Sequence, residues 1–332
     1  MRTYRVDIAW RTVLAAGLAC SGWLHAQTAQ TRAKVPTAIP RYQAQGPVKG
    51  PIDLPGPDEL ADLGGEWATA FRKIHPDANL VYRSKLTKDA VKDFLEGTSL
   101  LIMAARELTT DEAKAFQAKF GYMPMRIPVC LDANIVFVHK SNPLTQITME
   151  QLDAIYSKSR LGGAKAQALV WGDLGLRGEW AKLPIKAYAR GEGTTTRASF
   201  AEKAMLKGEY RTGIQERDDP SALAEAVMTD QAGIAFGTMA SWYFANKVIP
   251  VVPYHGEDAR FPNQDSVTTS KYPMPRLFYA YLNRTPGKPL PGPIQELTHF
   301  LLTQEGQSAV ADSGLLPGPP EFLTIALKRL SR

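Results

Sequence analysis

The sequence predicts an α/β protein with two lobes. Short apolar segments of strand type alternate along the chain with longer segments whose apolar residues recur every three or four positions, and this alternation is typical of α/β folds. The chain has 332 residues, of which 44% are hydrophobic and 22% charged. This composition is ordinary for a globular protein, and the length favours two domains or lobes over one.

Capping residues and glycines place several of the expected helix ends. Thr87 caps one helix, which stops at Gly97, and the next expected helix ends at Gly121. The expected helices span 59–74, 87–96, 110–120, 148–156, 196–206, 221–229 and 294–311. The expected strands span 79–83, 100–105, 127–131, 134–139, 185–188, 233–236, 249–252 and 277–282. Residues 27–57 are rich in Pro, Gly and Gln without periodicity, which indicates an irregular arm.

The N-terminus is interpreted as a secretory signal peptide over residues 1–26. Three arginines precede an apolar stretch at 13–24 that is too short to span a bilayer comfortably. An uncleaved N-terminal anchor is the alternative. A lipid anchor at Cys20 is a weaker one, because lipoprotein signals prefer leucine three residues before the cysteine and this chain has Gly17 there.

Charge and cysteine content narrow the choice of partners. Loss of residues 1–26 would lower the formal net charge from +6 to +4, because three arginines and one aspartate are removed. This mild excess fits an anionic ligand, whereas the chain has no basic run with interleaved aromatics that would predict a nucleic-acid partner. Cys130 would then be the only cysteine, and its apolar surroundings at 127–131 predict a buried, unreactive thiol.

The sequence offers no arrangement typical of an active site. No histidine pairs recognisably with a nucleophile, and no group of histidines and carboxylates has the spacing of a metal site. We therefore expect neither catalytic residues nor a metal or cofactor, and we expect the protein not to be an enzyme. A phosphatase is the enzymatic alternative.

Residues 188–205 carry the most informative signal. A run of strand type leads to Arg190, and Thr194, Thr195 and Thr196 then open a helix-forming run. The first backbone N–H groups of a helix lack partners within the helix, and the helix dipole favours negative charge there. Arg190 adds a guanidinium that can hold an oxyanion through two hydrogen bonds. The segment predicts an oxyanion site, and the alternative is an ordinary capped helix with a surface arginine.

Several longer runs resemble the secreted phosphate-binding proteins of ABC transporters. They follow one another in the family's order and cover roughly residues 55–320. The runs are Ile127 to Ala133, Val136 to Pro143, Gln151 to Ser157, Trp171 to Leu176, Gly178 to Ala181, Ala232 to Phe236 and Glu305 to Gln307.

The resemblance implies a type II periplasmic binding protein, in which two α/β lobes joined by two crossing strands hold a ligand in the cleft between them. By that analogy lobe 1 takes about 55–127 and 253–320, and lobe 2 takes about 128–252. Residues 27–54 remain an irregular N-terminal arm and 321–332 a C-terminal tail. The resemblance also implies a periplasmic or secreted monomer that passes inorganic phosphate or a similar oxyanion to an ABC transporter permease in the inner membrane.

The family's ligand residues match this chain less fully than its scaffold does. Arg190 stands where the family has an arginine, and Thr194-Thr195-Thr196 matches a Ser-Gly-Thr run. Thr195 replaces a glycine whose lack of a side chain lets the backbone approach an anion. The family's first Gly/Ser-rich loop falls on 85–89. Here Thr87 keeps a hydroxyl and Lys88 adds a cation.

Other loops have lost hydroxyls. Ala105-Arg106 stands where related members have serine and arginine, and residues 56–59 lack the usual hydroxyls. The resemblance thus implies ligand contacts from Arg190, Thr194, Thr195, Thr196, Thr87, Lys88 and Arg106. Two functions stay open. The chain is either a solute-binding protein that captures phosphate or a related oxyanion for an ABC transporter, or a degenerate binding-protein fold that acts as an envelope sensor or scaffold without transport.

Overall fold

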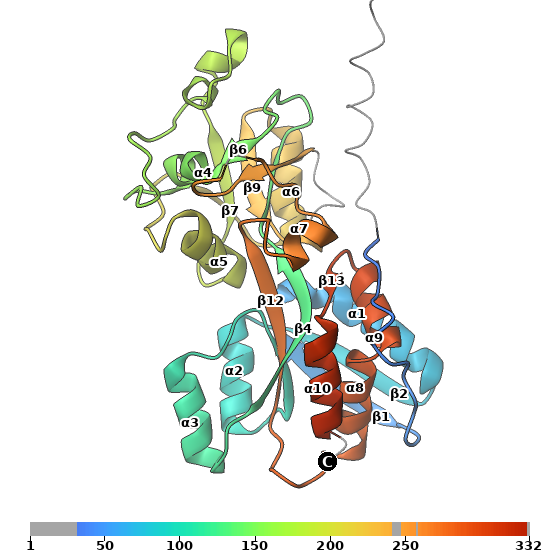
Figure 1. Cartoon of the computed structure of the whole chain (residues 1–332). Coiled ribbons are helices and arrows are strands. Elements are labelled where there is room, and N and C mark those ends of the chain that lie inside the picture. Colours follow the sequence, from blue (N-terminus) through green and yellow to red (C-terminus); the bar gives the residue numbers. More distant parts are fainter. Residues whose placement is uncertain (1–31, 241–246, 257, 331–332) are drawn as a thin grey trace, which may run out of the picture. The chain divides into compact units, whose positions relative to one another are not determined.

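A computed structural model of the chain describes residues 32–240, 247–256 and 258–330 (Figure 1). Residues Arg32–Arg332 form one compact unit. The predicted signal peptide at 1–26, including Cys20, lies outside the described residues, as does the start of the predicted arm. Within the described ranges, no helix is both long and apolar enough to cross a membrane.

The first lobe contains two sheets. Its strands are β1 (Gly50–Gly56), β2 (Ala78–Ser84), β3 (Leu101–Ala104), β4 (Met125–Ala133), β12 (Pro275–Leu282) and β13 (Leu316–Pro317). β1 and β2 form a parallel pair, and the other four strands form an antiparallel sheet in the order β13-β4-β12-β3. β1 falls within the stretch expected to be irregular, and its buried residues Ile52 and Leu54 alternate with exposed Asp53 as a half-buried strand requires.

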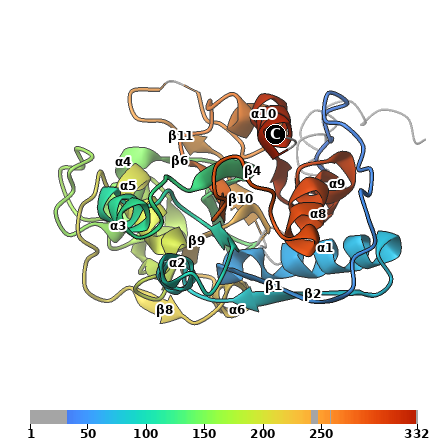
Figure 2. The ribbon, with the colours of Figure 1, turned by 90° about the horizontal axis from the view of Figure 1, so that it is seen from below.

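Helices cover these sheets. They are the short 3-10 helix η1 (Asp58–Leu60) and the α-helices α1 (Ala61–Ile74), α2 (Thr87–Glu96), α3 (Thr110–Phe120), α8 (Gly292–Leu301), α9 (Gln304–Asp312) and α10 (Pro320–Leu330). α1 packs between β2 and α9 (Figure 2). Its fully buried Trp67 donates a hydrogen bond to the backbone oxygen of Gly306 in α9 at 3.0 Å, so the indole stays paired inside the core.

The second lobe is built on a five-stranded sheet and also contains the two-stranded sheet β11-β6. The strands of the lobe are β5 (Ile135–Val138), β6 (Ile147–Thr148), β7 (Lys186–Arg190), β8 (Gln215–Arg217), β9 (Gly233–Gly237), β10 (Lys247–Ile249) and β11 (Val251–Val252). The large sheet has the order β10-β5-β9-β7-β8, and β7 runs parallel to both of its neighbours. The helices are α4 (Met149–Tyr156), η2 (Trp171–Leu174), η3 (Gly178–Lys182), α5 (Thr195–Ala204), α6 (Pro220–Thr229) and α7 (Gln264–Thr268).

Aromatic packing fixes α5 against this sheet. Phe200 of α5 stacks on Phe236 of β9 with ring centroids 3.7 Å apart, and Tyr156 of α4 meets both rings edge-on. Tyr156 also donates a hydrogen bond to the backbone oxygen of Ile234 at 3.0 Å. The helix start that follows β7 is therefore held by a rigid core.

The long strands β4 and β12 link the two lobes. They pair antiparallel from Ala133 opposite Pro275 to Met125 opposite Leu282, with one irregularity between Phe278 and Tyr279. The chain leaves the first lobe along β4 and enters β5 after Asn134, and it returns along β12 (Figure 1). Side chains near Ala133 at the end of β4 and near Pro275 at the start of β12 consequently lie between the lobes.

Two predicted elements are divided in the structure. The single helix expected at 294–311 is two helices, α8 and α9, because the chain turns at Leu302 and Thr303 and the Thr303 hydroxyl bonds to the Phe300 backbone oxygen at 2.9 Å. The strand expected at 249–252 is β10 and β11, which are separated by Pro250. Proline has no N–H to donate to a strand ladder.

Cys130 and α10 complete the first lobe. The Cys130 side chain is fully buried in β4, as predicted, and burial raises the pKa of its thiol well above the usual value.

Residues expected to be a C-terminal tail form the helix α10. Leu323, Ala326 and Leu330 of this helix are buried, at the spacing of one helical face.

Candidate functional site

The start of α5 is an unusual helix N-terminus because its cap comes from another part of the chain. Thr194 occupies the N-cap position, but its side chain makes no capping bond and instead donates to the Gly191 backbone oxygen at 2.9 Å. The backbone N–H of Thr196 donates to Glu59 Oε1 at 3.1 Å. Glu59 lies in η1, between β1 and α1 of the first lobe. The helix start is therefore satisfied across the two lobes.

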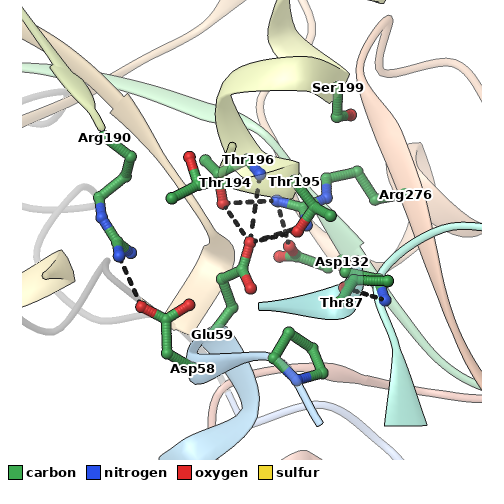
Figure 3. A network of polar contacts seen from close by, with 12 residues as sticks. Asp58, Glu59, Thr87, Asp132, Arg190, Thr194, Thr195, Thr196, Ser199 and Arg276 are labelled. Atoms are coloured by element: carbon green, nitrogen blue, oxygen red, sulfur yellow. Dashed lines mark hydrogen bonds and ion pairs between the residues drawn. The ribbon is translucent and has the colours of Figure 1, made fainter. Parts of the chain in front are cut away.

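Glu59 is the centre of a buried network (Figure 3). Its Oε1 also accepts hydrogen bonds from the hydroxyls of Thr195 and Thr196, each at 2.7 Å. Arg276 at the start of β12 approaches the same oxygen at 3.4 Å through Nη2. One carboxylate oxygen thus faces two hydroxyls, one backbone N–H and one guanidinium.

The chemistry of this network keeps Glu59 ionised. Burial alone would raise the pKa of its carboxyl, but the charge of Arg276 and the hydrogen bonds from Thr195 and Thr196 outweigh burial and hold the pKa below its usual value. These are the donors that stabilise an anion: hydroxyls, a helix N-terminus and a guanidinium. In the structure these donors hold a side-chain carboxylate, that of Glu59.

Arg276 connects this carboxylate to the strands that join the lobes. Its Nη1 donates to Thr196 Oγ1 at 3.1 Å and to Asn134 Oδ1 at 3.3 Å, and it lies 3.6 Å from Asp132 Oδ2. Asp132, at the end of β4, is fully buried and accepts the Met239 N–H at 2.7 Å. Burial, only partly offset by Arg276, raises the pKa of Asp132 to about 6. The structure thus places Asp132 in the same charged network as Glu59 and Arg276.

Two buried atoms of this network lack hydrogen-bond partners among the described residues. They are Arg276 Nε and Asp132 Oδ2, although the latter keeps its ion pair. Because an unpaired buried polar atom costs free energy, such atoms tend to mark a place where a further group binds. A cavity of about 570 Å³ adjoins Arg276 and is also lined by Thr195, Arg106 and Tyr279.

Arg190 makes a second ion pair between the lobes. Its Nη2 lies 2.5 Å from Asp58 Oδ2 and donates to the Asp218 backbone oxygen at 2.8 Å. The Arg190 side chain is buried, and its Nε and Nη1 have no hydrogen-bond partner in the described part of the chain. Burial and the neighbouring charge of Glu59 raise the pKa of Asp58, which Arg190 lowers only in part. Arg190 is therefore not the surface arginine of the alternative interpretation.

Thr87, Lys88 and Arg106 lie on the first-lobe side of this region. The buried Thr87 hydroxyl accepts the Ala105 N–H at 3.3 Å, whereas Lys88 is exposed at the start of α2. Arg106 binds both oxygens of Glu112, at 2.7 and 2.8 Å. Arg106 is thus already paired with a carboxylate of its own lobe.

A cavity of about 430 Å³ brings most of the expected ligand residues together. It is lined by Thr87, Lys88, Arg106, Thr194 and Thr195. Arg190 and Thr196 do not line it, because they are engaged in the buried contacts with Asp58 and Glu59. The seven expected residues thus divide between an open cavity and the closed network beside it.

Arg197, in the first turn of α5, is held by three neighbours. Its guanidinium lies over the Tyr210 ring, 4.3 Å from the ring centroid, and donates to Glu216 Oε1 at 2.6 Å. Its Nη1 donates to the Arg190 backbone oxygen at 3.0 Å as well. These contacts brace the end of β7, which carries Arg190.

Sequence reasoning missed Asp58, Glu59 and Arg276 as members of the site. The only local signal was the pair of acids that replaces hydroxyls at 58–59, directly after a strand and before a helix. Arg276 carried none, because its contact with Glu59 joins residues 217 positions apart in the sequence. Within the described ranges, no group of three or more His, Cys, Asp or Glu residues is placed to hold a metal ion.

Two α/β lobes joined by two long strands, with buried polar side chains gathered where these strands and the helix starts converge, are the arrangement of solute-binding proteins. The sequence model of the PBP superfamily domain matches residues 43–304. The chain belongs to this superfamily and, within it, to the family of the phosphate-binding proteins of ABC transporters.

Individual relatives support this placement. The chain is 32% identical over 298 residues to the phosphate-binding protein PstS of Pseudomonas aeruginosa. The aligned region covers 90% of this chain and 92% of that protein. It is 27% identical to protein SphX of Synechococcus elongatus over 79% of this chain and 76% of that protein. Among solved structures, a putative phosphate ABC transporter substrate-binding protein from Clostridium perfringens aligns with a TM-score of 0.64 at 22% identity. That alignment covers 81% of this chain and 100% of the other, and it supports the fold.

Proposed function

We propose that this chain is a secreted solute-binding protein that captures phosphate or a related oxyanion for an ABC transporter. The single observation that carries the proposal is the donor set at the start of α5. Thr195, Thr196 and Arg276 already bind one carboxylate oxygen at hydrogen-bond or ion-pair distance. A phosphate oxygen presents the same kind of acceptor, and the named relatives in Pseudomonas aeruginosa and Clostridium perfringens are phosphate-binding proteins.

The mechanism would be capture without chemistry. The ligand would enter between the lobes and meet the α5 start from the second lobe, Arg276 from the linking strands, and Thr87 and Lys88 from the α2 start. Closure would bend the linking strands β4 and β12 and exclude water, which strengthens each hydrogen bond to the anion. The proposal keeps the expected lobe boundaries near residues 127 and 253, except that α7 (264–268) is counted with the second lobe.

The partners follow from the family and the N-terminus. The proposed form is periplasmic or secreted and monomeric, with residues 1–26 removed, and it would dock its closed form on an inner-membrane permease. A lipid anchor at Cys20 remains the weaker alternative.

One observation favours a second candidate, a binding-protein fold that acts as an envelope sensor or scaffold without transport. The network holds three carboxylates, Asp58, Glu59 and Asp132, against two guanidiniums, Arg190 and Arg276. If all five were ionised, the network would be net negative by one charge. A site of that sign would repel a phosphate dianion unless a carboxylate moved away or took up a proton.

Calorimetry tests the choice. The exported protein is unfolded and refolded to remove carried-over ligand and is then titrated with phosphate, sulfate, arsenate and a phosphonate. Micromolar or tighter phosphate binding that is weakened in Arg276→Ala supports transport-type capture. Absence of heat and of thermal shift with every anion supports the sensor or scaffold role.

A further inference from the structure

Glu59 joins the two lobes at the place where a captured anion would join them. It belongs to η1 of the first lobe, and its carboxylate ends at the first turn of α5 in the second lobe. The contact is buried, because Glu59 is 7% exposed and Thr196 1%. Figure 3 shows the carboxylate pointing away from its own helix toward Thr195, Thr196 and Arg276.

The bonds to Glu59 differ from those of an ordinary buried ion pair. A structural salt bridge needs one cation, and Arg276 already has Asp132 within 3.6 Å. Glu59 in addition takes two hydroxyls and a helix N–H that has no local cap. If Asp132 neutralises Arg276, these three donors are the ones left for an anionic ligand. The Glu59 carboxylate uses all three.

We infer that Glu59 is an internal ligand of the anion site, and that an external oxyanion must displace its carboxylate to bind. The inference rests on the proposed function. Glu59 thereby sets the affinity of the site and holds the lobes together when no solute is bound. The apparent affinity for an anion equals the intrinsic affinity multiplied by the fraction of molecules whose site is free. A carboxylate bound in about 90% of molecules therefore weakens anion binding about tenfold.

Charged groups on the neighbouring elements act on the Glu59 carboxylate in opposite directions. From η1, Asp58 repels it, and from β4, Asp132 does so at longer range. From β12, Arg276 attracts it, while Arg190 of β7 is already engaged by Asp58. Arg276 Nε remains without a hydrogen bond among the described residues, so an incoming oxyanion would find one donor that Glu59 does not use.

The test compares the full exported chain with its Glu59→Ser variant. Serine removes the internal carboxylate, leaves the α5 donors free and supplies a hydroxyl. Glu66→Ser is the matched control, because Glu66 is an exposed residue of α1. Inorganic phosphate is titrated by calorimetry into each refolded protein. We expect Glu59→Ser to bind phosphate at least about tenfold more tightly than wild type, and Glu66→Ser to bind like wild type.

Scattering gives a readout that needs no binding constant. The radius of gyration of ligand-free wild type should be that of its phosphate-saturated form, since the internal ligand keeps the lobes together. Ligand-free Glu59→Ser should have a larger radius that phosphate reduces. An unchanged radius in this variant would overturn the inference. If the serine variant does not fold, Glu59→Ala removes the carboxylate together with every acceptor on this side chain and serves in both experiments.

The outcomes separate this inference from the proposed function. Phosphate binding by wild type that is not tighter in Glu59→Ser keeps the proposed function and overturns the internal ligand. Binding by the variant alone supports the internal ligand and refutes capture by the wild-type protein. Binding by neither refutes both, and binding by both with the variant tighter supports both.

Discussion

Glu59 accepts both the backbone N–H and the hydroxyl of Thr196, at 3.1 and 2.7 Å, although the two residues are 137 positions apart in the sequence. A carboxylate at a helix start is common when the helix supplies its own cap, a few residues away. Here the cap comes from the opposite lobe. The Glu59 carboxylate therefore caps the helix, pairs with Arg276 and links the two lobes.

Loss of the Arg190 cation should destabilise the fold. Arg190→Met leaves Asp58 partly buried without its partner, and removal of one member of a buried pair costs about 3 kcal/mol. Urea denaturation of the variant measures this loss. Combining it with Asp58→Asn should restore part of the stability, giving a coupling free energy of about 1 kcal/mol or more. Strictly additive effects would show that the pair seen between η1 and β7 does not contribute.

Gly306 should not tolerate a side chain, whereas Gly65 should. A Cβ on Gly306 would lie 2.2 Å from the Phe300 backbone oxygen and 2.8 Å from the Leu301 Cα, and backbone cannot easily move. Gly306→Ala should therefore lower the unfolding free energy by about 1–3 kcal/mol. Gly65 lies in α1 with nothing within 4 Å of its would-be Cβ, so Gly65→Ala should raise the unfolding free energy by about 0.5–1 kcal/mol. Equal effects of the two substitutions would contradict the tight corner between α8 and α9.

Asp132 should make the protein less stable as pH rises from about 4 to about 6. Its folded-state pKa is raised to about 6, so in this range the folded state binds more protons than the unfolded state does. The loss of unfolding free energy is absent at pH values below the pKa of Asp132 in the unfolded state. It is complete above the pKa of Asp132 in the folded state. Removing the carboxyl with Asp132→Asn should flatten this part of the pH profile.

The measurement is the unfolding free energy of wild type and variant between pH 4.5 and 6.5. The difference between the two curves isolates the contribution of Asp132 from that of the groups common to both proteins. Glu59 contributes with the opposite sign, because its lowered pKa adds stability that is lost only at more acidic pH. Parallel curves for wild type and Asp132→Asn would mean that Asp132 has no raised pKa.

Thiol counting tests both the burial of Cys130 and the removal of residues 1–26. The fully buried Cys130 should not react with a thiol reagent in the folded exported protein. After unfolding, one thiol should react per chain if residues 1–26, which include Cys20, are removed as proposed. Two reactive thiols after unfolding would indicate an uncleaved N-terminus, and rapid reaction in the folded state would contradict the packing of β4.

The sequence was sufficient for the scaffold because its signals are local. Periodicity and the terminal glycines predicted α2 and α3 with the bounds observed, but the expected cap of α2 was wrong, because Leu86 holds the N-cap position and the Thr87 hydroxyl accepts the Ala105 N–H instead. The strand expected at 185–188 and the threonines after it predicted the α5 start to within one residue. The divided helix at Leu302 and Thr303 escaped prediction, since the turn depends on Gly306 packing closely on the preceding helix. Helix α10 and strand β1 escaped it for a similar reason, because each is held by contacts distant in sequence.

The candidate site was less predictable than the fold. Hydroxyls and cations could be found by type, but their partners could not. Arg190 looked like a ligand for an anion, and its nearest acid, Asp58, lies 132 positions earlier. The replacement of hydroxyls by two acids at 58–59 could have indicated that the chain supplies its own carboxylate to the site. Only the folded arrangement shows that Glu59 reaches the α5 donors.

Calorimetric titration of the stripped exported chain with phosphate, for wild type and Thr196→Val, tests the central claim most directly. The valine variant keeps the shape of Thr196 but removes the hydroxyl that donates to the bound carboxylate and accepts from Arg276. We predict micromolar or tighter binding by wild type and at least about tenfold weaker binding by the variant, the effect of losing one hydrogen bond to a charged group. Equal phosphate affinities, or no binding by wild type, would contradict an anion site at the start of α5.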